Sequence, residues 1–162
     1  MTKLYACFLA LSLVAATASA KIKSTALTGT WKVTSVKTTG PNARTVTSPQ
    51  PGLYVFTGTH YSIMTINSDQ PRPLLPTDLT KATADELRAV YGPFTANSGT
   101  YEASGANVTF KPEVAKNPPV MAPGATNVSS FKIEGNTLTL TSVRNQDGPV
   151  ANPTTTTLTR VE

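Results

Sequence analysis

Few residues in this sequence could carry out covalent or acid–base chemistry. Among 162 residues there are one cysteine, Cys7, and one histidine, His60, too few for a zinc finger, a disulfide scaffold or a Cys/His metal cluster. Neither a Gly-x-Ser-x-Gly nucleophile motif nor a glycine-rich phosphate loop leading into a helix occurs. His60 follows the turn signal Gly58-Thr59 and is expected to face outward. The sequence therefore predicts no catalytic residue, no metal site and no cofactor.

Arg144 is the side chain that most clearly suggests ligand binding. Strand alternation places it on the same side as Ser129 and Ser142, facing inward near the end of a predicted strand. A buried cation is costly without a partner, and no acidic residue is expected on that side. A ligand carboxylate or phosphate would supply the partner. The alternative is that Arg144 extends into solvent or binds loop carbonyls.

Large apolar residues are expected to share this inward side. Alternation along the neighbouring strands selects five of them as a candidate ligand lining: Tyr54, Ile63, Tyr101, Phe110 and Phe131. Together with Phe56 and Tyr61, these side chains could instead fill the interior completely. The serines and Gly99 leave space toward one end, so any pocket is expected in that half.

The elements that position these residues are predicted to be mostly strands. The chain has 28 threonines and only 14% charged residues, which favours β structure over helix. Alternating or β-rich runs predict eight strands, at 28–37, 53–57, 60–66, 99–103, 106–111, 127–134, 137–144 and 154–161. One short helix is expected between the third and fourth strands, because Thr83 to Glu86 form a capping box and Gly92-Pro93 ends the run. This helix could cover the outer face of strands two and three, where Leu53 and Met64 lie.

The connections between the strands alternate in length. Two-residue turn signals occur at Gly58-Thr59, Ser104-Gly105 and Gly135-Asn136. The other four connections between strands are long and span residues 38–52, 67–98, 112–126 and 145–153. Alternate connections of an antiparallel meander lie at opposite ends. The sequence therefore predicts an all-β protein, an eight-stranded antiparallel up-and-down β-barrel with short turns at one end and long loops at the other.

The N-terminal residues have the pattern of a secretory signal peptide. Residues 1–20 contain Lys3, a short apolar run and Ala18-Ser19-Ala20, a small-residue cleavage signal. Cleavage would leave residues 21–162 as one domain, secreted or periplasmic, with no stable membrane insertion because no second apolar stretch follows. The net charge of +5 comes from scattered basic residues, so nucleic acid is not an expected partner.

The two ends of the predicted barrel carry a family resemblance. Gly29-Thr30-Trp31 opens the first strand and Leu158-Thr159-Arg160 closes the last. The chain resembles the bacterial lipocalin-like domain proteins, and the matching segments are LTGTWKVTSV (27–36), PGLYVFTGTHYSIM (51–64), SGTYEASGANVTF (98–110) and FKIEGNTLTLTS (131–142). The resemblance implies a lipocalin-type barrel in which Trp31 packs under Arg160 at the closed end, both as structural residues. The chain lacks the disulfides and the full second and third motifs of true lipocalins, so the resemblance implies no particular ligand.

Three functions from different classes fit this sequence. The first is binding of a small, largely apolar molecule in the upper half of the barrel, with an acidic group if Arg144 is its anchor. The second is an isomerase or cyclase, which needs an acid or a tyrosine pair in the cavity; the acidic residues are expected in loops, in the helix or facing outward, so an enzyme is disfavoured. The third is an interaction or inhibitor protein with a filled core that presents loops 67–77 and 112–124. The oligomeric state is left open.

Overall fold

The computed structural model describes residues 24–162, and the predicted signal peptide lies outside the described residues. Ten strands, one α-helix and three 3-10 helices follow one another in these residues: η1 (Ser24–Ala26), β1 (Gly29–Thr38), β2 (Arg44–Val46), β3 (Leu53–Phe56), β4 (His60–Ile66), η2 (Leu79–Lys81), α1 (Ala84–Tyr91), β5 (Phe94–Ser104), β6 (Asn107–Ala115), η3 (Pro118–Met121), β7 (Asn127–Glu134), β8 (Thr137–Asn145), β9 (Gly148–Pro149) and β10 (Thr154–Arg160). Within this part of the chain, no helix is long and apolar enough to cross a membrane.

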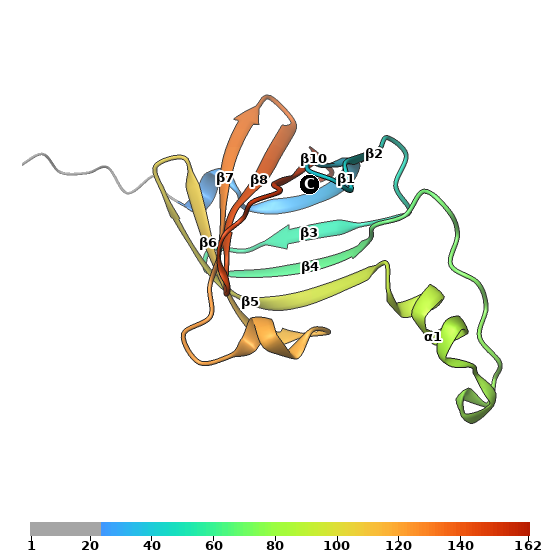
Figure 1. The fold of residues 1–162 in the computed structure, drawn as a ribbon. Coiled ribbons are helices and arrows are strands. Elements are labelled where there is room, and N and C mark those ends of the chain that lie inside the picture. Colours follow the sequence, from blue (N-terminus) through green and yellow to red (C-terminus); the bar gives the residue numbers. More distant parts are fainter. Residues whose placement is uncertain (1–23) are drawn as a thin grey trace, which may run out of the picture.

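Eight of the strands form a closed antiparallel barrel (Figure 1). Consecutive long strands pair in chain order from β3 to β8, β1 pairs with β3, and β10 closes the ring by pairing with both β8 and β1. The two remaining strands, β2 and β9, are short additions at the ends of β1 and β8. The predicted fold class is confirmed, including the single short helix between β4 and β5.

The turns at one end are two residues long, as predicted. Thr57 and His60 bracket the first, where the amide of Thr57 donates to the carbonyl of His60 at 2.8 Å. The turn after β5 is shifted by one residue from the expectation, since Ser104 pairs with Asn107 and the turn is Gly105-Ala106. Gly105 has a φ of +57°, which glycine adopts at little cost, so the glycine takes the first turn position. Moving the turn by one residue offsets the pairing of the two strands by two residues. An even offset leaves the same side chains facing inward on β5 and β6.

The core fills the half of the barrel with the short turns. Its most completely buried side chains are Trp31, Tyr61, Phe56, Leu27, Leu138, Leu158 and Val108. Aromatic rings contact each other edge to face, with ring centroids 5.2 Å apart for Phe56 and Tyr101 and 4.8 Å apart for Tyr61 and Phe110. Such pairs favour a single packed arrangement.

Threonines form much of the outer surface of β8 and β10. Thr141 faces Thr155 and Thr139 faces Thr157 across the two strands, and the hydroxyl oxygens of Thr141 and Thr155 are 3.0 Å apart. Threonine suits this position because its β-branched side chain packs on a pleated sheet while its hydroxyl remains hydrogen-bonded.

Helix α1 begins as the sequence predicted but lies elsewhere than expected. Thr83 and Glu86 make the two reciprocal hydrogen bonds of a capping box. The helix lies beyond the ends of β4 and β5, away from the barrel wall (Figure 1), and Leu53 and Met64 on the outer wall remain 39% and 50% exposed. The expectation that the helix covers these residues is therefore wrong. The ammonium of Lys116, just after β6, donates hydrogen bonds to the carbonyls of Tyr91, at the end of α1, and Phe94, at the start of β5.

Candidate functional site

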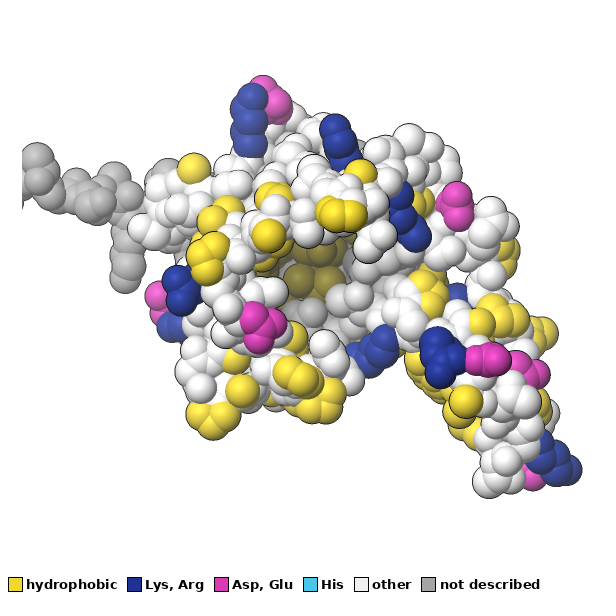
Figure 2. Space-filling view, viewed as in Figure 1, with side chains coloured by type: hydrophobic (Ala, Val, Ile, Leu, Met, Phe, Trp, Pro, Cys, Tyr) yellow, Lys and Arg dark blue, Asp and Glu magenta, His cyan; other side chains and the backbone are white. Residues whose placement is uncertain are grey.

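A cavity of about 210 Å³ opens at the end of the barrel where the long loops lie. The space-filling view shows a hollow in the middle of the barrel, with hydrophobic side chains at its bottom (Figure 2). Ten residues from β3, β4, β5, β6, β7, β8 and β10 line the cavity: Tyr54, Ile63, Asn97, Phe110, Asn127, Ser129, Leu140, Ser142, Thr154 and Thr156. A dry cavity of roughly 150 Å³ is known to hold benzene, so this one is large enough for a small organic molecule.

The deeper part of the cavity is apolar. Ile63, Phe110 and Leu140 are almost fully buried and belong to the hydrophobic core. Phe110 packs against Tyr61 and, at 6.2 Å between centroids, against Phe56. This floor is held by packing from below, and it would contact the apolar part of any bound molecule.

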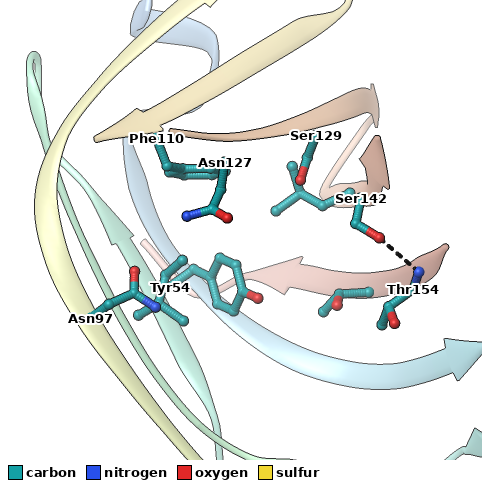
Figure 3. Close-up of a pocket in the computed structure, with 10 residues that line it drawn as sticks. Tyr54, Asn97, Phe110, Asn127, Ser129, Ser142 and Thr154 are labelled. Carbon is teal, nitrogen blue, oxygen red and sulfur yellow. Dashed lines mark hydrogen bonds between the residues drawn. The ribbon is translucent and has the colours of Figure 1, made fainter. Parts of the chain in front are cut away.

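Four of the polar lining side chains are already engaged within the protein, and one of them is Thr154, whose hydroxyl oxygen lies 3.4 Å from that of Thr38. The hydroxyl of Ser142 accepts a hydrogen bond of 2.8 Å from the amide of Thr154 (Figure 3). Burial raises the pKa of Tyr54 above its ordinary value, and a hydrogen bond with the Thr156 side chain opposes this shift. The phenol is therefore neutral at physiological pH.

Three further polar side chains point into the cavity: Asn97, Asn127 and Ser129 (Figure 3). Asn97 comes from β5, whereas the other two lie two positions apart on β7. Within residues 24–162 none of these three side chains takes part in a hydrogen bond. They therefore offer unused donors and acceptors to a molecule in the cavity.

Five of the eight ligand-binding residues predicted from the sequence line this cavity: Tyr54, Ile63, Phe110, Ser129 and Ser142. Tyr101 and Phe131 do not. Tyr101 is buried near the closed end, where its hydroxyl donates to the carbonyl of Thr57 at 2.7 Å, and Phe131 packs against the core from its edge. Strand alternation gave the face of these two residues correctly, but it carries no information on depth along the barrel axis.

Arg144 does not reach the cavity, and its prediction as an inward anchor is corrected. Ser129 pairs with Ser142, but the next residue back, Val128, pairs with Arg144. Strand β8 thus contains one extra residue, Val143, and this bulge reverses the alternation beyond it. Arg144 lies opposite an outward-facing position and is exposed. Because Arg144 lies outside the cavity, it gives no reason to expect an acidic group on the ligand.

The sequence prediction missed five lining residues. Leu140, Thr154 and Thr156 were on the expected inward face but were not selected. Asn97 fell in a segment expected to be loop, because β5 begins five residues earlier than predicted, at Phe94. Extending the alternation back from Gly99 to Asn97, and from Ser129 to Asn127, would have found both asparagines.

At the opposite end of the barrel, Arg160 lies over Trp31. The guanidinium carbon is 4.0 Å from the centroid of the indole ring. The guanidinium nitrogens donate to the carbonyls of Thr28, at 2.6 Å, and Ala26, at 3.1 Å, and the indole nitrogen donates to Leu27 at 2.7 Å. These contacts tie the N-terminal segment across this end of the barrel.

Among the described residues no cluster of three or more His, Cys, Asp or Glu side chains could hold a metal ion. Within residues 24–162 one buried side-chain polar atom has no hydrogen-bond partner, the hydroxyl oxygen of Tyr61. Burial raises the pKa of this phenol well above its ordinary value, and the negative charge of Glu113 adds to the shift.

The fold and the cavity together define a small closed antiparallel barrel with space for a ligand at its open end. The family model of the lipocalin-like domain matches residues 28–160, so the chain belongs to the lipocalin-like domain family. Comparison with curated proteins and with solved structures gave no match. Membership of this family suggests small-molecule binding in general terms and specifies no ligand.

Proposed function

We propose that this protein is exported and binds a small, largely apolar molecule in the upper half of its barrel. The observation that carries the proposal is the cavity of about 210 Å³ at the open end, with an apolar floor and a polar rim. Such a combination is typical of small-molecule sites, where apolar walls supply affinity and a few polar groups fix orientation.

Two other functions have less support from this cavity. An isomerase or cyclase was expected to need an acid or a pair of tyrosines, and the lining contains one tyrosine and no acidic residue. An interaction protein that acts only through its loops was expected to have a filled core. Binding is therefore the function that the geometry favours.

Native mass spectrometry of the protein purified from its producing cells tests binding. A stoichiometric adduct of small mass is expected. Ser129→Trp should abolish it, because the indole would occupy the cavity, whereas Ser130→Trp should retain it, because Ser130 faces the outside on the same strand. An adduct that survives Ser129→Trp would contradict binding in this cavity, and so would the absence of any adduct combined with no response to added small molecules.

Export rests on the sequence of residues 1–20. Expression of the full chain, followed by N-terminal sequencing of the protein in the medium and in the periplasm, should give a mature chain that begins at Lys21. Recovery of the intact chain from the cell interior alone would refute this part of the proposal.

A further inference from the structure

We infer that the cavity selects uncharged ligands that carry an amide-like pair of one hydrogen-bond donor and one acceptor. This inference rests on the proposed binding function and names the chemical class that the site accepts. It depends on two features of the lining: its lack of charge, and the position of its two asparagines.

None of the ten lining residues is charged. Arg144, the nearest candidate from the sequence, faces outward because of the bulge in β8. A carboxylate, phosphate or ammonium group in the cavity would lose hydration and gain no opposite charge in return. The lining therefore disfavours charged ligands of either sign.

Asn97 and Asn127 approach the cavity from different strands, and both amides point into it (Figure 3). Each side chain offers an NH₂ donor and a carbonyl acceptor. Within the described part of the chain neither amide has a hydrogen bond, so both are left to bind water. A ligand that covers them displaces this water from both amides. A ligand that provides neither a donor nor an acceptor leaves these groups unsatisfied, which is the unfavourable case.

A primary amide, a small lactam or a urea group satisfies these requirements. It is neutral, and its N–H and C=O groups lie side by side, as they do in the asparagine side chain itself. The hydroxyl of Ser129, two positions along β7, offers a third contact. The apolar part of the ligand then lies on Ile63, Phe110 and Leu140, below the amides.

The cavity volume limits the part of the ligand that it encloses. Scaling from benzene in a cavity of roughly 150 Å³, about 210 Å³ encloses a group of about eight non-hydrogen atoms. Benzamide, benzoate and isopropylbenzene have this approximate size and nearly the same shape. Benzamide has a hydrogen-bond donor and an acceptor, benzoate has a negative charge, and isopropylbenzene has no polar group.

Titration of the full mature protein with these three compounds, followed by protein-detected NMR, tests the inference. Benzamide should bind at least about tenfold more tightly than benzoate. Asn97→Leu and Asn127→Leu, which keep the side-chain shape, should each weaken benzamide binding about tenfold and leave isopropylbenzene binding unchanged or tighter. Asn107→Leu, at the exposed first position of β6, is the matched control and should change neither.

The outcomes separate this inference from the proposed function. If benzoate binds as tightly as benzamide, or if the asparagine variants affect benzamide and isopropylbenzene equally, the selectivity is wrong while binding in the cavity stands. If none of the three compounds perturbs resonances of the lining residues, both the selectivity and the cavity as a binding site are refuted for ligands of this size. Unchanged dispersion of the amide resonances in each variant confirms that the barrel is folded.

Discussion

Removal of the Arg160 side chain should destabilise the closed end of the barrel. In Arg160→Ala the guanidinium that lies 4.0 Å from the Trp31 ring is lost, together with its hydrogen bonds to the carbonyls of Thr28 and Ala26. A cation–π contact at a partly exposed site contributes about 1 kcal/mol. Hydrogen bonds to charged groups contribute about 1.5–3 kcal/mol when buried, and each of these two is taken at about 1 kcal/mol because Arg160 is only half-buried and solvent screens its charge.

The expected decrease in the free energy of unfolding is therefore about 2–3 kcal/mol, equivalent to roughly 5–10 °C in melting temperature for a chain of this length. Trp31 is the only tryptophan of the sequence, so urea unfolding followed by tryptophan fluorescence reports directly on this end of the barrel. Arg160→Lys should give an intermediate loss, because an ammonium can neither stack flat on the indole nor bind both carbonyls in the same way.

Arg144→Ala provides the matched control. Arg144 is exposed, and none of the hydrogen bonds or ion pairs of residues 24–162 involves its side chain. Its replacement should change stability by no more than about 0.5 kcal/mol. If Arg160→Ala is no more destabilising than Arg144→Ala, the contacts of Arg160 do not stabilise the barrel end and the reasoning fails.

Three further predictions concern glycine and tyrosine positions, and urea denaturation checks each. Gly99→Ala should lower the free energy of unfolding by about 3 kcal/mol or prevent folding, because a Cβ there would lie 2.1 Å from a backbone oxygen of β6. Gly58→Ala, with open space around its Cβ, should lower it little. Equal losses in the two variants would contradict this reasoning. Tyr61→Phe removes a hydroxyl without a partner, so stability should stay unchanged or rise by up to about 1 kcal/mol. Tyr101→Phe removes a hydrogen-bonded hydroxyl and should lower stability by about 1 kcal/mol. The reverse order would mean that the Tyr61 hydroxyl has a partner. Burial raises the pKa of Tyr54 and of Tyr61, so the unfolded chain ionises first and stability should fall above about pH 10; a double Phe variant with the same decline would refute this cause.

Much of the fold could be predicted because it follows from local patterns. Seven of the eight predicted barrel strands begin within one residue of the observed ones, and the capping box at Thr83 starts the helix as expected. Alternation of side chains identifies the inward face wherever one face is buried. Alternation of short and long connections then fixes which ends of the strands lie together. These are properties of neighbouring residues, so a single sequence contains them.

The candidate site was predicted only in part. Alternation placed Tyr54, Ile63, Phe110, Ser129 and Ser142 inside, and these line the cavity. The same rule also selected Tyr101 and Phe131, because it treats every inward position alike. Distance from the closed end depends on strand tilt and on the size of the side chains below, which are properties of the assembled barrel.

The sequence by itself determined an all-β chain of eight barrel strands, the end of the barrel with long loops, and a shortage of groups for covalent chemistry. Only the tertiary structure decided the depth of the cavity and the charge of its lining. The bulge at Val143 shows the physical reason. An extra residue in one strand is defined by its pairing with another strand, and this pairing turned Arg144 from the interior to the surface. The cavity was left with uncharged amides at its rim, and these now define the ligand to look for.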